Sequence, residues 1–426
     1  MTSTANPATF FDRVIDLYEE MPYPEVPIED SAADTTNVQF KVNLTTAQYA
    51  RTRQILKSEG ATILNAGCGS GWETLIVAEA NPGAHLVAID LSPESVKVTE
   101  RRLRFHGFTN IDVYAMDLLE LPQLNMEFDF ISCNDVLYLL DSPVEGLKAL
   151  KAVLKPEGII RTNLHNAYTR RNMLDMQEAF RILGLFDLPR ARAAEAVREC
   201  MTHLTKSSSQ AGGWNPAVYV SNPAIMNNYL LSGDKGFTIL DTFRFLKESG
   251  LGMISLVDFP TWQFKSLFKQ MPKIIEDKLE HLSQVELLHL YELFFPNGHR
   301  LIDFWAEHEN SSLVFPWTDE NWLEGIVMIN PLLASAPNFL TNLMNAVEKQ
   351  DFLEITWAGC PERLRIPAEH VTWLSRLATG PKSVQDLINT FADRNNQDRE
   401  QATEKVLAYM QALEDYFFLL LSPADA

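Results

Sequence analysis

The sequence predicts an α/β fold whose first half contains a doubly wound, mainly parallel sheet. Between about residues 55 and 165, short apolar runs alternate with helical patterns. Each run is bounded by Gly, Asp or Asn, which is typical of strand ends. At 426 residues the chain is long enough for about two or three domains. Because strands that alternate with helices form parallel sheets, one sheet is expected in this stretch.

Five segments carry the strand pattern, and helical patterns fill the gaps between them. The helix after the second strand is marked best: Ser92 is its cap, Pro93 lies in its first turn and Gly107 ends it. The predicted strands are ATILNAG at 61–67, AHLVAID at 84–90, NIDVYAMD at 110–117, FDFISCND at 128–135 and GIIRTNLH at 158–165.

Changes in composition and in hydrophobic pattern along the chain predict four parts. Residues 1–54 form an N-terminal segment, 55–205 hold the sheet, 206–365 form a mixed, mainly helical second domain, and 366–426 form a small terminal unit. A Gly/Ser/Asn/Pro-rich loop at 207–223 marks the start of the second domain.

The terminal unit shows two helical patterns around a Thr-Gly-Pro turn, then a third helix and an apolar run. Ser383 is the predicted cap of the second helix. This order resembles a winged-helix unit. We expect it to serve docking or dimerisation rather than DNA binding, because its second helix carries acids and no Arg.

Composition narrows the class of protein. With 36 basic and 56 acidic residues the net charge is −20, so nucleic acid is a poor partner. No apolar run reaches about 18 residues and no signal peptide is recognisable, so we expect no membrane partner and a cytoplasmic location. The four cysteines form no CxxC pair, and His281 and His289, on an expected helix, lack the HxxxH spacing, so we expect no metal site.

The strongest motif is NAGCGSGWE at 65–73, where glycines alternate between a strand end and a helix. Glycines there let the backbone turn sharply and approach a ligand. Asp90 closes the second strand, 19 residues after Gly71, where its carboxylate can accept hydrogen bonds from ribose hydroxyls. Asp117, Asn134 and Asp135 end the next two strands. Four strand ends therefore converge on one crevice.

These motifs, with LKPEGII, resemble class I S-adenosylmethionine methyltransferases of Rossmann-like fold over about residues 55–165. The resemblance implies S-adenosylmethionine as cofactor and S-adenosylhomocysteine as product. A nicotinamide site instead predicts GxGxxG, whereas Trp72 follows Gly71. The cofactor-binding residues implied are Asn65, Gly67, Cys68, Gly69, Gly71, Asp90, Leu91, Met116, Asp117, Leu118, Asn134 and Asp135, with Asp90 at the ribose and Asp117 at the adenine.

One position departs from this family. Its members usually carry Asp or Glu where this chain has Asn65, at a position that helps to hold the methionine ammonium. An amide accepts a hydrogen bond without charge-assisted strength. Either cofactor affinity is reduced or Glu73 supplies the charge.

A second resemblance lies outside the sheet. LYEEMPYPEVPIED at 17–30 is similar to the Tyr-plus-PYP lid of bacterial methyltransferases that carry a regulatory domain, including protein-lysine methyltransferases. Residues 227–251 are similar to the core of that domain. The long extension also resembles cyanobacterial methyltransferases, among which the phycobiliprotein asparagine methylase is known.

The predicted catalytic residues lie on the lid, at the end of the fourth strand and after the fifth: His165, Tyr18, Tyr23, Asn134 and Tyr138, with Asp135 and Tyr168 also facing the substrate. His165 is the best general-base candidate, since neutral imidazole takes a proton near pH 7. Alternatively, His165 only orders its loop through hydrogen bonds, and Tyr18 and Tyr23 only pack within the lid without a chemical role.

Other charged and thiol side chains are given structural roles. Cys68 and Cys133 are expected to be buried apolar residues. Four arginines, Arg161, Arg170, Arg171 and Arg181, are expected on solvated faces rather than at an acidic substrate.

The extension of about 260 residues offers area for a macromolecular partner, so a protein side-chain nitrogen, of lysine or asparagine, is the first substrate class. The alternatives are a small-molecule N- or O-methyltransferase whose extra domains close the pocket, the phycobiliprotein asparagine methylase, and a non-catalytic module that binds S-adenosylmethionine. A homodimer is possible in each case.

Overall fold

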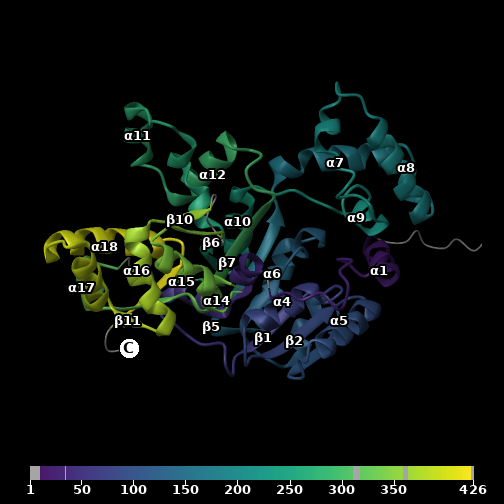
Figure 1. Ribbon diagram of the computed structural model, residues 1–426. Helices are drawn as coiled ribbons and strands as arrows, with labels where there is room; N and C mark the ends of the chain where they lie inside the picture. Colours follow the sequence, from purple (N-terminus) through teal and green to yellow (C-terminus); the bar gives the residue numbers. More distant parts are fainter. Residues whose placement is uncertain (1–9, 34, 310–316, 337, 358–362, 424–426) are drawn as a thin grey trace, which may run out of the picture.

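The computed structural model describes residues 10–33, 35–309, 317–336, 338–357 and 363–423. Its centre is a seven-stranded sheet of order β3-β2-β1-β4-β5-β7-β6 (Figure 1). Strands β1 to β5 run parallel, and β7 is antiparallel to both β5 and β6. The predicted α/β fold with a mainly parallel sheet is confirmed. The strands are β1 (Thr62–Ala66), β2 (His85–Asp90), β3 (Ile111–Ala115), β4 (Phe128–Cys133), β5 (Leu154–His165), β6 (Leu251–Leu256) and β7 (Leu301–His308).

Helices α4 (Trp72–Ala80), α5 (Pro93–Phe105) and α6 (Pro143–Ala152) connect the parallel strands. The start of α5 is as predicted: the Ser92 hydroxyl accepts a hydrogen bond from the Ser95 N–H at 3.1 Å, and Pro93 is in the first turn. Gly107 follows the helix with φ +83°, a conformation that favours glycine.

The sheet crosses the boundary that the sequence suggested at 205/206. Both β6 and β7 come from the range 206–365, yet β7 pairs with β5 along its last six residues, from Ile160 to His165. A buried ion pair between Arg161 on β5 and Asp303 on β7 accompanies this pairing. The second domain is therefore continuous with the sheet.

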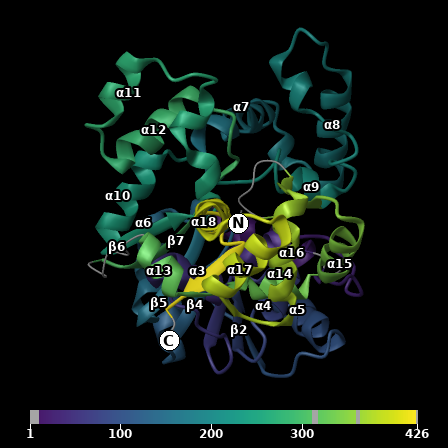
Figure 2. The ribbon, with the colours of Figure 1, turned by 60° about the vertical axis from the view of Figure 1, so that its left-hand side comes forward.

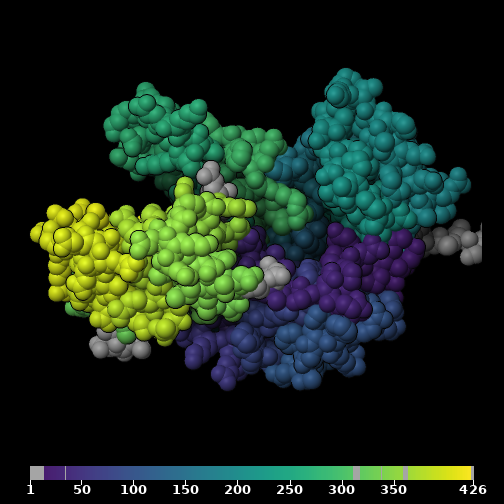
Figure 3. Space-filling model, in the orientation of Figure 1, coloured from purple at the N-terminus to yellow at the C-terminus, as the bar shows by residue number. Residues whose placement is uncertain are grey.

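Two helical lobes rise from the sheet and leave a deep notch between them (Figures 1 and 3). One lobe holds α7 (Ala167–Ile182), α8 (Arg190–His203) and α9 (Asn222–Met226). The other holds α10 (Ile239–Ser249), α11 (Lys273–Leu279) and α12 (Gln284–Phe294). The loop predicted at 207–223 contains one short turn of 3-10 helix, η4 (Ser209–Gly213). His281 lies in the turn between α11 and α12, so the expected single helix carrying His281 and His289 is wrong.

The terminal unit contains α16 (Ala368–Arg376), α17 (Val384–Asn395) and α18 (Arg399–Glu414), and Ser383 caps α17 as predicted. Its three-stranded sheet has the order β11-β8-β12, and the middle strand comes from outside 366–426. The assignment of this unit as a winged helix therefore stays a prediction. The strands are β8 (Ile326–Ile329), β11 (Lys382–Ser383) and β12 (Leu419–Ser422); nearby lie α13 (Asp319–Glu324), α14 (Pro331–Ser335), α15 (Phe339–Lys349), β9 (Leu353–Ile355) and β10 (Leu364–Ile366).

The N-terminal segment joins the terminal unit to the sheet (Figure 2). It holds α1 (Phe10–Glu20), α2 (Thr36–Val42) and α3 (Leu44–Thr52). The ring of Phe40 lies 5.9 Å from that of Trp305 on β7 and 6.4 Å from that of Phe417 before β12. The buried Tyr49 hydroxyl accepts a hydrogen bond from the Leu421 N–H at 2.9 Å. One apolar core therefore spans both parts. No helix of the described ranges is long and apolar enough to cross a membrane.

The four arginines expected in solvent divide into two pairs. Arg171 and Arg181 are exposed and pair with Asp175 and Glu178 one helical turn away, as predicted. Arg161 and Arg170 are buried, so the prediction is wrong for them. Each has a buried aspartate partner far away in the sequence, Asp303 and Asp234, and this pairing offsets the cost of burying the charge.

We expect Asp303→Ala to lower the free energy of unfolding by about 3–5 kcal/mol, because the buried Arg161 guanidinium would lose its carboxylate. Thermal or urea unfolding measures this. The matched control is Asp175→Ala, which breaks an exposed pair and should cost less than about 0.5 kcal/mol. Equal losses in the two variants would contradict a special role for the buried pair.

Candidate functional site

A cavity of about 640 Å³ lies where the parallel strands end. The lid segment and the loop before α9 contribute further lining residues. Residues from the ends of β2 and β4 and from the loop after β1 form its base. The predicted site residues in its wall are Gly67, Cys68, Gly69, Asp90, Leu91, Met116, Asp117, Leu118, Asn134, Asp135, Tyr138, His165, Tyr18 and Tyr23. Asn65, Gly71 and Tyr168 are not in that wall.

The glycine loop is shaped for close approach. Gly67 has φ +84° and Gly69 has φ +53°. A Cβ atom on Gly67 would lie 2.3 Å from the Val136 side chain, and one on Gly69 would lie 2.3 Å from the Tyr23 carbonyl oxygen. Gly71 serves packing instead, since a Cβ there would lie 2.7 Å from the Thr99 backbone on α5. Larger residues are therefore excluded at all three positions.

Two aspartates face the cavity with carboxylates oriented by the backbone. Asp90 accepts hydrogen bonds from the Gly69 N–H at 2.8 Å and from the Ser92 N–H at 2.9 Å. Burial raises the pKa of Asp90, and these two bonds oppose the rise. Asp117 accepts from the Leu119 N–H at 2.9 Å through one oxygen. Both carboxylates keep lone pairs for a ligand's hydroxyl or amino group.

The expectation for Asn65 requires correction. Its amide is buried beneath the cavity, where it accepts from the Thr74 hydroxyl at 2.6 Å and donates to the Ser132 carbonyl at 3.4 Å. Glu73, on the first turn of α4, lines the cavity instead. The Glu73 carboxylate accepts from the Ser132 hydroxyl at 2.7 Å and lies 3.4 Å from the Arg161 guanidinium. Glu73 is therefore better placed than Asn65 to offer a carboxylate to a ligand; burial raises the pKa of Glu73, and Arg161 and Ser132 oppose that rise.

Asp135 presents an unused acceptor. It has φ +55°, and one of its buried carboxylate oxygens makes no hydrogen bond in the described part of the chain. Its backbone N–H donates to the Asn163 side chain at 3.0 Å, and Asn163 also donates to Asn134. A buried acceptor without a donor indicates that a ligand's polar hydrogen completes the site.

His165, at the end of β5, has its ring orientation fixed on three sides. Its Nδ1 lies 2.7 Å from Asp234, and its ring stacks on Tyr138 at 3.7 Å between centroids. Its Nε2 lies 3.4 Å from the guanidinium of Arg300. Burial lowers the pKa of His165, and the hydrogen bond to Asp234 opposes that effect. The imidazole is therefore neutral at pH 7, with the proton on Nδ1 and a lone pair on Nε2.

The two lid tyrosines differ in their surroundings. The Tyr18 hydroxyl donates to the Asn227 side chain at 2.9 Å, so the lid is tied to the lobe that holds α9. The Tyr23 carbonyl accepts from the Ser70 N–H at 3.0 Å, which holds the lid against the glycine loop. Burial raises the pKa of both phenols, so neither ionises near neutral pH.

The two cysteines are inert as predicted. Both are buried, and burial raises the pKa of the Cys68 thiol well above its usual value and that of Cys133 to about 12. In the parts of the chain that the structure describes, no group of three His, Cys, Asp or Glu side chains is placed to hold a metal ion.

Sequence reasoning missed four residues of this site. Asn227, Asn228 and Arg300 line the cavity, and Asp234 orients His165. The SGD turn at 232–234 follows the stretch NNYLL, whose two asparagines both reach the cavity. Polar residues next to an apolar run are only a weak signal of a binding site. No spacing rule connects these residues to the strand that ends at His165, about 60 residues earlier in the sequence.

Comparisons with known proteins agree with this geometry. Residues 57–214 match the model of a family described as "Methyltransferase domain". The chain carries the catalytic domain of an S-adenosylmethionine-dependent methyltransferase. It is 27% identical to an uncharacterized protein of Synechococcus sp. over 297 residues, 68% of this chain and 70% of that protein. It is 30% identical to a malonyl-[acyl-carrier protein] O-methyltransferase of Halalkalibacterium halodurans over 142 residues, 32% of this chain and about half (51%) of that enzyme.

A solved structure is similar over most of the chain. PKMT2 from Rickettsia typhi matches with a TM-score of 0.63 at 15% identity, covering 90% of this chain and 75% of that one. A second structure of PKMT2 contains AdoHcy and matches with a TM-score of 0.60. The methyltransferase fold therefore extends to the lobes around the sheet.

The residues present fit S-adenosylmethionine. Gly67 and Gly69 line the cavity without side chains, Asp90 and Asp117 offer acceptors at two strand ends, and the carboxylates of Glu73 and Asp135 match a cationic ligand. When bound, the cofactor supplies a methyl group activated by a sulfonium.

We expect Glu73→Gln to weaken binding of S-adenosylhomocysteine by about tenfold and to leave binding of 5′-methylthioadenosine within about twofold, because only the former carries an ammonium. Calorimetry measures both. Asp90→Ala is the control, since it should weaken both ligands through the ribose. Equal losses for the two ligands in Glu73→Gln would assign the ammonium to another residue.

Proposed function

We propose that this enzyme methylates a nitrogen atom on a protein side chain, with lysine as the first candidate. The observation that carries the proposal is the open mouth of the cavity. Val38, Val218 and Arg300 line the cavity and are exposed, so the cavity reaches the surface. A notch between the two lobes is visible in Figure 3. A long side chain can enter there while its backbone stays outside.

His165 is the proposed general base. Its Nδ1 proton is directed to Asp234, so the Nε2 atom carries the lone pair; Nε2 faces the exposed Arg300 guanidinium at 3.4 Å, which an incoming substrate nitrogen would displace. A lysine ammonium must lose one proton before its nitrogen can attack, and Nε2 accepts that proton. The carboxylate of Asp234 stabilises the imidazolium that results.

The surrounding rings favour the neutral amine. Tyr18 and Tyr138 line the cavity beside His165, and both phenols are neutral at pH 7 because burial raises their pKa. An ammonium in such a site loses solvation, which lowers its pKa and eases its deprotonation. The same enclosure keeps water from the methyl group.

A small molecule is the second candidate substrate, and Arg300 is the observation that favours it. The Arg300 guanidinium lies in the cavity wall 3.4 Å from His165 and 3.9 Å from Asp135. A guanidinium in this position can hold the carboxylate of a free acid while the acid's nucleophile meets His165. The relative in Halalkalibacterium halodurans is an O-methyltransferase.

We expect kcat to fall as the pH drops through the pKa of His165, which burial places below its usual value of 6.5. Asp234 raises that pKa, so Asp234→Asn should move the acid limb to lower pH and also reduce kcat. His165→Gln should remove the limb and lower kcat by about 100-fold or more. Rate profiles between pH 5 and 9 measure this, with Tyr168→Phe as a control outside the cavity. An unchanged acid limb in His165→Gln would exclude His165 as the base.

We expect methyl-labelled S-adenosylmethionine, added with the enzyme to a lysate of the source cell, to place label on one polypeptide. Mass spectrometry of that band then identifies lysine or asparagine as the acceptor. Asp90→Ala protein is the control for unrelated transfer. Label confined to the small-molecule fraction would favour the second candidate, with Arg300→Gln as the next variant.

A further inference from the structure

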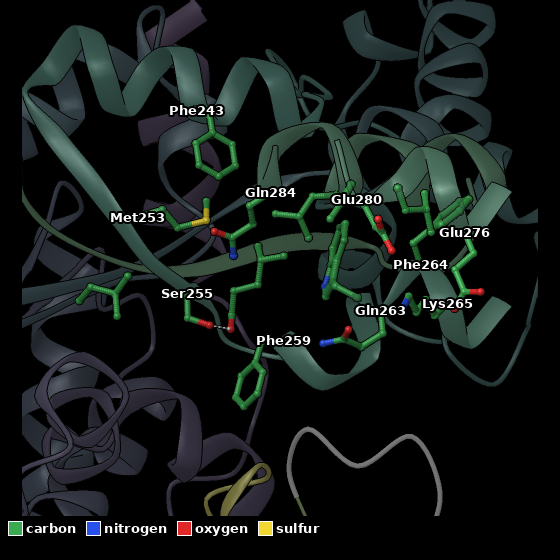
Figure 4. Close-up of a pocket in the computed structure, with 16 residues that line it drawn as sticks. Phe243, Met253, Ser255, Phe259, Gln263, Phe264, Lys265, Glu276, Glu280 and Gln284 are labelled. Carbon is green, nitrogen blue, oxygen red and sulfur yellow. Dashed lines mark hydrogen bonds between the residues drawn. The ribbon is translucent and has the colours of Figure 1, made fainter. Parts of the chain in front are cut away.

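A second cavity, of about 500 Å³, lies in the lobe that holds α10, α11 and α12. It shares no lining residue with the cofactor cavity. Strand β6 forms one wall, and the short helices η5 (Phe259–Trp262) and η6 (Phe264–Leu267) form another. Figure 4 shows the side chains from these elements and from the three helices converging on one space. Its size suits a small organic molecule.

The wall of this second cavity combines apolar residues, several of them aromatic, with polar side chains such as Gln263 and Gln284. Trp262 is buried and rigid, since it stacks on His299 at 4.3 Å and packs against Tyr291 at 5.3 Å. Apolar groups come from six elements, so the cavity is not a gap under a single loop. They are Phe243, Met253, Ile254, Leu256, Phe259, Trp262, Phe264, Leu279, Leu287 and Leu288.

The rim of the second cavity is acidic. Glu276 and Glu280 on and beside α11 line it, against one ammonium from Lys265. Glu276 is paired with Lys273 at 3.4 Å. The exposed Glu280 carboxylate makes no hydrogen bond or ion pair with any residue in the described ranges. Figure 4 shows both carboxyl groups on the same side of the cavity as Phe264, with Phe243 and Met253 across from them.

We propose that this second cavity binds an amphipathic organic amine, with an aromatic or large aliphatic body and a primary ammonium. The apolar body would displace water from the ring-lined wall. The ammonium would lie at the rim, where Glu280 offers an unpaired carboxylate and aromatic faces attract cations. A net charge of −20 on the chain favours a cation over an anion. The site is distinct from methyl transfer and goes beyond the proposed function.

Tryptamine is a suitable probe, because it joins an indole ring to a primary ammonium. It is titrated into the full-length protein by calorimetry with S-adenosylhomocysteine at saturation, so that the cofactor part of the first cavity is filled. Indole-3-propionate, which has the same ring and the opposite charge, is the matched ligand. We expect tryptamine to bind at least about tenfold more tightly than indole-3-propionate.

Three variants test the location. Glu280→Gln should weaken tryptamine binding about threefold to fivefold, and Lys265→Gln should tighten it about twofold, because each changes one rim charge. Gln284→Trp, at an exposed lining position of α12, should fill the space and weaken binding at least about tenfold. Asp277→Asn is the control, since this exposed carboxylate on α11 does not line the cavity.

The proposal is overturned by any of three results. The first is that tryptamine does not bind at millimolar concentration. The second is that indole-3-propionate binds as tightly as tryptamine. The third is that the Gln284→Trp protein, with an unchanged unfolding temperature, binds tryptamine as tightly as the parent protein does. Retention of S-adenosylhomocysteine binding in every variant separates these results from failure of the methyltransferase site.

Discussion

The buried ion pair of Arg161 and Asp303 is the interaction on which the rest of the structure depends. Two hydrogen bonds of 2.8 and 2.7 Å join β5 to a strand 142 positions later. Because both charges are buried, neither can be satisfied by water, and only one register of β7 against β5 brings them together. Arg161 also reaches Glu73 in the cofactor cavity, and Asp303 is contacted by Lys41 from the N-terminal segment. One charge network therefore connects the site, the sheet and helix α2 of the N-terminal segment.

A second network has the same form at the catalytic end of the cavity. Asp234 accepts from His165, Arg170 and Gln177, and its own side chain is fully buried. Since Asp234 belongs to the turn before α10, the orientation of His165 depends on a segment outside the parallel sheet. Tyr138 adds a stacked ring from the turn after β4. The imidazole is thus positioned by three separate parts of the chain, and its tautomer is set by the partner of Nδ1.

The parallel half of the fold could be predicted from sequence because its signals are local. Period-two apolar runs, glycines at strand ends and the Ser92 cap each depend on a few neighbouring residues. The remaining features depend on distant partners. Arg161 looked solvated because Asp303 is far away in the sequence, and β7 reads as LIDFWAEH, in which the buried aspartate resembles a surface charge. The alternatives left open for Asn65 and Glu73 could not be separated for a similar reason: which of the two side chains lines the cavity depends on how α4 packs on β1.

The residues of the cavity also differ in whether local sequence patterns or contacts between distant parts of the chain position them. The acceptors toward the cofactor, Asp90 and Asp117, lie in the stretch that matches the methyltransferase domain. Of the residues proposed to meet a substrate, His165 and Tyr138 lie inside that stretch, whereas Tyr18, Tyr23, Asn227 and Arg300 lie outside it. Because Tyr18 donates to Asn227, the lid and one lobe close the cavity together. We therefore expect substrate specificity to depend chiefly on the lid and the lobe that it contacts, so that a change of substrate requires changes there while the glycine loop stays the same.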